Sequence, residues 1–205
     1  METLTWDQRP NLIKKRSNAK SFSNQSVEPE SLHLVIEAAR RTPSYMNEQP
    51  WNFIIITNGD ADNYQNLLEC LAETNITLAR HAPVLMLAVA RLNFENDGGR
   101  NNYAFRDLAQ AVSNLASRAG VLGLQTHQMA GFDAAMARSR FQIPDGHDPV
   151  AVIALGYPMG GPSWQPDQQQ REEPSDLRRS IESMAFAGKW GQPATLPSPK
   201  LQPCP

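Results

Sequence analysis

Two short segments near the N-terminus combine residue types that could bind a phosphorylated, planar ligand. The first, KKRSNAKSF at residues 14–22, places Arg16 and Lys20 around Ser17 and Asn18. Cationic side chains with short hydroxyl or amide donors are the combination that binds a phosphate dianion. A basic run is more often a solvated surface, so these residues alone do not establish a phosphate site.

The second segment, PSYMNEQPW at residues 43–51, is a loop that contains two prolines. Asn47 and Gln49 offer paired amide donors and acceptors, which suit the polar edge of a flat heterocycle. The alternative is a structured turn that holds Trp51 in the core. On its own, therefore, this loop is also only a hypothetical binding site.

Several common catalytic motifs are absent from the sequence. There is no GxGxxG, GxxxxGK(S/T) or GxSxG motif, which argues against the usual dinucleotide loop, a P-loop and a nucleophile elbow. The four histidines form no HExxH pair, and Cys70 and Cys204 have no metal-ligand spacing. We therefore expect no metal site.

Apolar periodicity predicts the elements that would position the two segments. Helices are expected from Pro29 to about residue 41, after residues 59–60, roughly over residues 102–122, and after a capping Asp133. Strands are expected over residues 52–57, 84–91, 126–132 and 150–157, and the first of them should be buried. The long helix has small and apolar residues on several sides, which indicates burial on more than one side.

Length and composition favour one globular, intracellular domain. The chain has 205 residues, of which 40% are hydrophobic and 20% charged, as in ordinary globular proteins. The formal net charge of -2 argues against broad binding to nucleic acid or anionic membranes. We find no signal-peptide core and no apolar stretch long enough to span a bilayer, so we expect a cytoplasmic protein.

Taken together, the two segments resemble the nitroreductase family of flavin enzymes. In that family an Arg-x-(Ser or Asn)-x-(Lys or Arg) segment precedes one helix and then a Pro-Ser-x-x-Asn-x-Gln-Pro-Trp loop. This sequence has RSNAK at residues 16–20 and PSYMNEQPW at residues 43–51. Further similar segments begin at Thr74, Gly123 and Val150. The resemblance covers roughly residues 10–190 and depends on the joint presence of all the segments.

The resemblance implies an α+β fold, in which a small mixed β-sheet is flanked by helices and a long core helix forms a dimer interface. It implies one FMN-binding domain over residues 1–190, followed by a Pro-rich tail over residues 191–205. FMN would be the cofactor, held at the subunit interface of a homodimer, and NADH or NADPH the electron donor. The expected reaction is ping-pong hydride transfer to a small organic acceptor such as a nitroaromatic, a quinone or a flavin.

The resemblance also implies roles for residues of the first segment. Arg16, Ser17 and Asn18 would hold the ribityl phosphate of FMN. Lys20 would lie near flavin N1 and O2, where a cation stabilises the negative charge of the reduced state. No side chain is expected to act as a covalent nucleophile.

Other positions of the implied cofactor site lie later in the chain. They are Pro43, Ser44, Tyr45 and Asn47 from the partner subunit, Asn75 near the pyrimidine edge, the segment Gln128, Met129, Ala130 and Gly131, and Arg178, with Arg179 as its alternative. The backbone N–H of Ala130 or Gly131 would face flavin N5. The alternative for Asn75 is an exposed asparagine at a helix end, for Gly131 a plain strand-end glycine, and for Arg178 a solvated helix start.

Two other functions remain open at this point. One is a flavin-cleaving or oxygen-using relative of the same fold, and the other is a non-enzymatic flavin-binding protein. The reductase is favoured because a cation at Lys20 suits a redox-active flavin better than passive storage. The sequence selects neither the acceptor nor the nicotinamide donor, and it does not predict how the Pro-rich tail docks.

Overall fold

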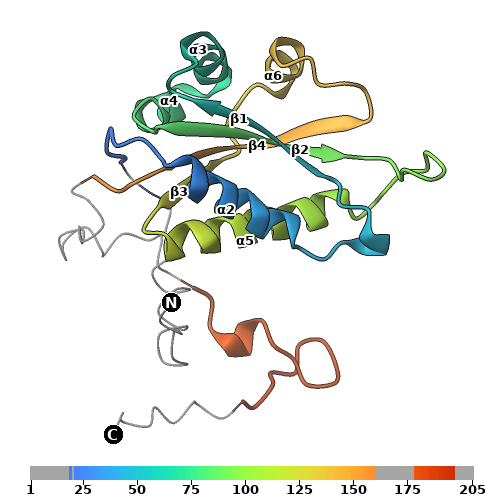
Figure 1. Cartoon of the computed structure of the whole chain (residues 1–205). Helices are drawn as coiled ribbons and strands as arrows, with labels where there is room; N and C mark the ends of the chain where they lie inside the picture. The colour runs from blue at the N-terminus through green and yellow to red at the C-terminus, as the bar shows by residue number, and fades with distance from the viewer. Residues whose placement is uncertain (1–18, 20, 160–177, 197–205) are drawn as a thin grey trace, which may run out of the picture. The chain divides into compact units, whose positions relative to one another are not determined.

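The computed structural model describes Ala19, residues 21–159 and residues 178–196 (Figure 1). It divides the chain into two compact units, residues 1–164 and 165–205. Four residues of the predicted cofactor site lie outside the described residues: Arg16, Ser17, Asn18 and Lys20. The end of the Pro-rich tail, from residue 197, lies outside them too, and the domain boundary at residue 190 stays a prediction.

Four strands form one sheet in the order β1-β2-β4-β3. They are β1 (Trp51–Thr57), β2 (Val84–Arg91), β3 (Gln125–Met129) and β4 (His147–Gly156). All four predicted strands are confirmed. The sheet was expected to be mixed, but each of its three described pairings is antiparallel. Two of these pairings, β1 with β2 and β3 with β4, join strands that follow one another in the sequence.

Helices cover both faces of this sheet (Figure 1). On one face lie α2 (Pro29–Arg40) and α5 (Ala104–Val121), side by side. On the other face lie α3 (Ala61–Cys70), α4 (Glu73–Ala79) and α6 (Ala134–Arg140). Each helix among the described residues is too short or too polar to pass through a lipid bilayer.

The two faces of the sheet contribute to two hydrophobic clusters. Successive side chains of a strand point to opposite faces, so Met86 and Ala88 of β2 pack with α2 and α5, and Leu85 and Leu87 pack with the other helices. Both faces of β2 are therefore buried, which explains why its sequence is apolar without interruption.

The edge strand β1 is less buried than its sequence suggests. Ile56 is buried, but Ile55 is 38% exposed, so the prediction of a buried strand is wrong for much of its length. A continuous apolar run indicates burial on both faces. At β1, however, only β2 pairs with the strand among the described residues, and the flanking helices cover it incompletely.

The long helix α5 presents one buried stripe to the sheet. Leu108, Ala111, Val112 and Leu115 belong to this stripe, together with further small residues. Phe105 is 45% exposed, so within a single chain the expected burial on more than one side is not found for this residue.

Candidate cofactor site

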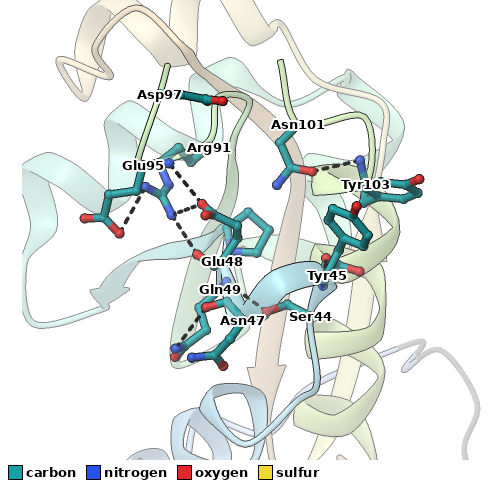
Figure 2. Close-up of polar contacts among 12 residues, drawn as sticks. Ser44, Tyr45, Asn47, Glu48, Gln49, Arg91, Glu95, Asp97, Asn101 and Tyr103 are labelled. Carbon is teal, nitrogen blue, oxygen red and sulfur yellow. Dashed lines mark hydrogen bonds and ion pairs between the residues drawn. The ribbon is translucent and has the colours of Figure 1, made fainter. Parts of the chain in front are cut away.

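The segment PSYMNEQPW at residues 43–51, which we call the Pro-flanked loop, lies between α2 and β1 (Figure 2). It contains a short 3₁₀ turn, η2 (Tyr45–Asn47). The Oγ of Ser44 accepts a hydrogen bond from the backbone N–H of Gln49 at 2.9 Å, which closes the loop on itself. Three residues have a positive φ: 52° at Met46, 58° at Asn47 and 46° at Gln49. A left-handed residue other than glycine costs about 1–3 kcal/mol, so contacts from outside the loop must stabilise this conformation.

The first turn of α5 holds the loop at Tyr45. The backbone N–H of Tyr45 donates to Oδ2 of Asp107 at 2.9 Å, and Asp107 is fully buried. The ring of Tyr45 lies 4.2 Å from the ring of Tyr103, centroid to centroid. Arg106 donates to the other carboxylate oxygen of Asp107 at 2.8 Å, and its guanidinium lies 4.6 Å from the centroid of the Tyr103 ring.

The end of β2 holds the loop at Glu48 (Figure 2). The Nη2 of Arg91 donates to the Glu48 carbonyl oxygen at 2.6 Å and to its Oε2 at 3.1 Å. The backbone N–H of Glu95 donates to the same Oε2 at 3.1 Å. The side chains of Arg91 and Glu48 are 20% and 11% exposed, so solvent screens this ion pair less than it screens a surface pair.

Asn75 and Gly131 form a second group on another part of the fold. The Nδ2 of Asn75 donates to the Gly131 carbonyl oxygen at 3.0 Å, and the backbone N–H of Ala72 donates to the same oxygen at 2.9 Å. A Cβ atom on residue 131 would lie 3.1 Å from the Asn75 amide nitrogen. Glycine therefore lets α4 approach the chain this closely after β3.

The free edge of β3 carries the third feature of the candidate site. The N–H of Ala19 donates to the Thr126 carbonyl oxygen at 3.1 Å, on the edge of β3 that faces away from β4. Every second residue of an antiparallel strand points its N–H to the same edge, so the N–H of Gln128 points there too, and Ala130 and Gly131 follow directly after the strand. The N–H groups of Ala130 and Gly131 donate to no residue in the described part of the chain.

Ala19 is the residue of the first segment that lies at this edge. It is buried, its carbonyl oxygen lies 2.8 Å from Nδ1 of His127, and it stands between Asn18 and Lys20 in the sequence. The side chain of Met129, in contrast, lies in the hydrophobic cluster under α3, α4 and α6. A ligand at the β3 edge would therefore meet the backbone of residues 128–131 rather than the Met129 side chain.

The Pro-flanked loop and the β3 edge do not form one site within a single chain. The loop lies beside the start of α5, on one side of the sheet, whereas Asn75 belongs to α4 on the opposite side (Figure 1). A site that uses both groups therefore needs a loop from a second copy of the chain.

The predicted late arginines belong to the second compact unit. Arg178 and Arg179 are both exposed there. Arg179 donates from Nη2 to the backbone carbonyl oxygen of Ser183, and from Nε to its Oγ at 3.3 Å. The role of either arginine at a phosphate stays a prediction.

Sequence reasoning missed the residues that hold the loop from outside. Burial of Asp107 could have been predicted from the sequence, because this residue lies in the buried stripe of α5, three residues after Ala104 and four before Ala111. A carboxylate in an apolar stripe needs a buried partner, which is a signal that a sequence can provide. The pairing of Glu48 with Arg91 joins residues 43 positions apart and has no such signal.

Comparisons with known proteins agree on one family. The model of the Nitroreductase family matches residues 13–82 and 72–157. A protein of Streptococcus pyogenes serotype M6, provisionally named an NAD(P)H nitroreductase, is 41% identical over 176 residues, which cover 71% of this chain and 88% of that protein. A protein of Methanothermobacter thermautotrophicus, provisionally named an NADH dehydrogenase/NAD(P)H nitroreductase, is 27% identical over 156 residues, covering 73% of this chain and 77% of that protein.

A solved structure described as an oxidoreductase containing FMN has the same fold. Its TM-score is 0.79 at 26% sequence identity, and the match covers 94% of this chain and 96% of that one. The predicted α+β class and the resemblance drawn from the sequence motifs are therefore confirmed. The chain belongs to the nitroreductase family and is an oxidoreductase of that type.

Proposed function

We propose that this chain is an FMN-dependent NAD(P)H oxidoreductase that reduces small organic acceptors, such as nitroaromatics, quinones or flavins, by a ping-pong mechanism. Bound FMN would supply two-electron hydride chemistry, and the protein would bind and orient the cofactor. The observation that carries the proposal lies at the β3 edge, where the N–H groups of Ala130 and Gly131, just after the strand that Ala19 contacts, donate to no described residue. Family membership and the FMN-containing structural relative support the same cofactor.

The described residues of the β3 edge suit a flavin ring. The N–H groups of Ala130 and Gly131 are donors without a partner in the described part of the chain, and one of them would face the N5 acceptor of the ring. The Asn75 amide is held by the Gly131 carbonyl group and would lie near the pyrimidine edge. Gln128 is exposed on the same strand, next to Met129 in the sequence.

The N-terminal segment would supply the remaining contacts that bind the cofactor. Arg16, Ser17 and Asn18 would bind the phosphate, and the contact of Ala19 with β3 supports this position for the segment. Lys20 would lie near N1 and O2 of the ring, where a fixed cation stabilises the charge that reduction adds. Arg178 would make a further phosphate contact.

A homodimer is part of the proposal. Pro43, Ser44, Tyr45 and Asn47 would reach the cofactor bound by the partner subunit, because the loop and the β3 edge lie apart within one chain. Exposed apolar side chains at Met46 and near the start of α5 support a contact surface there. Burial of such surface against a second copy would stabilise both subunits.

Stepwise reduction and reoxidation of the purified protein tests the function. We expect a yellow dimer whose flavin absorption band is lost on anaerobic addition of NADPH or NADH and returns when a nitroaromatic or a quinone is added. Ping-pong transfer requires that the reduced enzyme react with the acceptor after the oxidised nicotinamide has left. Removal of the nucleotide by gel filtration before the acceptor is added checks this order.

The same experiment separates the other two functions. Loss of the flavin itself in the presence of oxygen, with a cleaved product, would indicate a flavin-destroying enzyme. A yellow dimer that neither NADH nor NADPH can reduce would indicate a flavin-binding protein without reductase activity. A colourless monomer that takes up no added FMN would contradict the proposed function altogether.

A further inference from the structure

Asp107 is a fully buried carboxylate in the otherwise apolar stripe of α5. Burial of a charged group is costly unless hydrogen bonds and an opposite charge compensate it. Both are present: Oδ1 accepts from Nε and Nη2 of Arg106 at 2.9 and 2.8 Å, and Oδ2 accepts from the Tyr45 N–H at 2.9 Å. Replacement of a buried ion pair by apolar residues is often neutral or stabilising, so core packing alone does not explain an aspartate at this position.

The group that Asp107 holds is backbone, and it lies at the start of the strained turn. Tyr45 is the first residue of η2, and the left-handed residues Met46 and Asn47 follow it directly. Met46 is 67% exposed, and Asn47 is exposed too, so neither is fixed by packing of its own. The direction in which these two residues project is therefore set by two contacts that hold the loop on either side of them, which we call fixed points. The first is the bond from the Tyr45 N–H to Asp107.

The second fixed point lies at Glu48, whose carbonyl oxygen and carboxylate bind Arg91. The chain between Tyr45 and Glu48 is therefore held at both ends by groups from α5 and β2. Removal of one fixed point would let the turn relax toward commoner backbone angles, because left-handed conformations persist only where surrounding contacts enforce them.

We propose that Asp107 is a positioning residue for the cofactor-binding loop, which it holds through the Tyr45 N–H in the orientation that presents Ser44–Asn47 to the partner subunit's cofactor. This inference rests on the proposed function. Arg106 serves to balance the buried charge, and the hydrogen bond from Tyr45 is the contact on which cofactor affinity depends. Asp107 itself touches no cofactor.

Three variants separate the hydrogen bond from the charge. Asp107→Leu removes both, and we expect FMN to bind roughly tenfold to a hundredfold more weakly because a buried bond to a charged acceptor is lost. Asp107→Asn keeps an oxygen acceptor for the Tyr45 N–H, so its FMN affinity should stay within about threefold of wild type. Arg106→Met keeps the bond to Tyr45, so its FMN affinity should also stay near wild type, whereas its free energy of unfolding should fall because the buried carboxylate loses its opposite charge. FMN titration of the full-length dimer measures all three.

Amide hydrogen exchange of the cofactor-free protein provides a readout that is independent of FMN. The Tyr45 amide should be protected in the wild type, in Asp107→Asn and in Arg106→Met, and should exchange faster in Asp107→Leu while the β2 amides stay protected. Rapid hydrogen exchange of the Tyr45 amide in the wild-type protein would overturn the inference, whether or not Asp107→Leu folds. So would an Arg106→Met variant that loses as much FMN affinity as Asp107→Leu.

The two measurements also keep this inference apart from the proposed function. If the wild type binds no FMN but the exchange pattern is as expected, Asp107 still positions the loop and the proposed function fails. If FMN binds tightly to every variant, the function stands and the positioning role is wrong.

Discussion

Replacement of Arg16 by alanine should weaken FMN binding by roughly 10- to 100-fold. The guanidinium would make charge-assisted hydrogen bonds to the phosphate, and a bond to a charged group contributes about 1.5–3 kcal/mol. Lys20→Ala should also weaken binding, and it should in addition make the bound flavin harder to reduce, because the cation near N1 and O2 is gone. Titration with FMN followed by absorption, and the reduction potential of the bound flavin, measure the two effects.

Lys14 and Lys15 provide a matched control within the same basic run. If the run acts only as a diffuse positive surface, Lys14→Ala should weaken FMN binding as much as Arg16→Ala does, and high salt should abolish both effects. A specific phosphate contact predicts a small effect for Lys14→Ala and a large one for Arg16→Ala. Wild-type FMN occupancy in both the Arg16 and Lys20 variants would contradict the assigned site.

Gly156→Ala should lower the free energy of unfolding by about 1–3 kcal/mol, the usual cost of overpacking a tight core. A Cβ at the end of β4 would lie 2.5 Å from Cδ of Pro83 and 3.2 Å from Cδ1 of Phe22. The proline ring is rigid, so the strain must move backbone. Phe22 is the last residue of the segment KKRSNAKSF and forms a β-bridge with Pro158, so FMN binding should weaken as well.

Gly120 in α5 is the matched control for this substitution. Among the described residues, no atom outside its own helical surroundings lies within 4 Å of a Cβ built there. Gly120→Ala should therefore stabilise the protein by about 0.5–1 kcal/mol through higher helix propensity. Urea denaturation of both variants measures the difference, and equal stability of Gly156→Ala and wild type would show that the Pro83 contact is not tight.

Elements with strong local signals were predictable from the sequence. Pro29 begins α2 as expected, and Asp133 caps α6 by accepting a hydrogen bond from the Met136 N–H at 2.9 Å. The continuous apolar run of β2 was sufficient to predict a buried strand, because that strand is buried on both faces. The exposure of Ile55 and Phe105 was not predictable, since it depends on which neighbours cover a residue rather than on its own type.

The candidate site was predictable only in its parts. Motif spacing identified the Pro-flanked loop and the segment around Gly131, but local patterns carry no information on contacts such as Asn75 to Gly131, which are 56 positions apart. Nor did the sequence reveal that Asp107 and Arg91 hold the loop, because both contacts depend on how α5 and β2 meet it in space.

The separation of the Pro-flanked loop from the β3 edge has a consequence for mixtures of defective subunits. Suppose that each flavin pocket takes its phosphate-binding residues from one chain and its Pro-flanked loop from the other. A chain that lacks Arg16 and a chain that lacks the Asp107 contact are then defective in different parts of the pocket. Their heterodimer would concentrate both faults in one pocket and leave the other wholly native. Two preparations that each bind FMN weakly would, after exchange of subunits, contain pockets with the wild-type affinity that neither has alone.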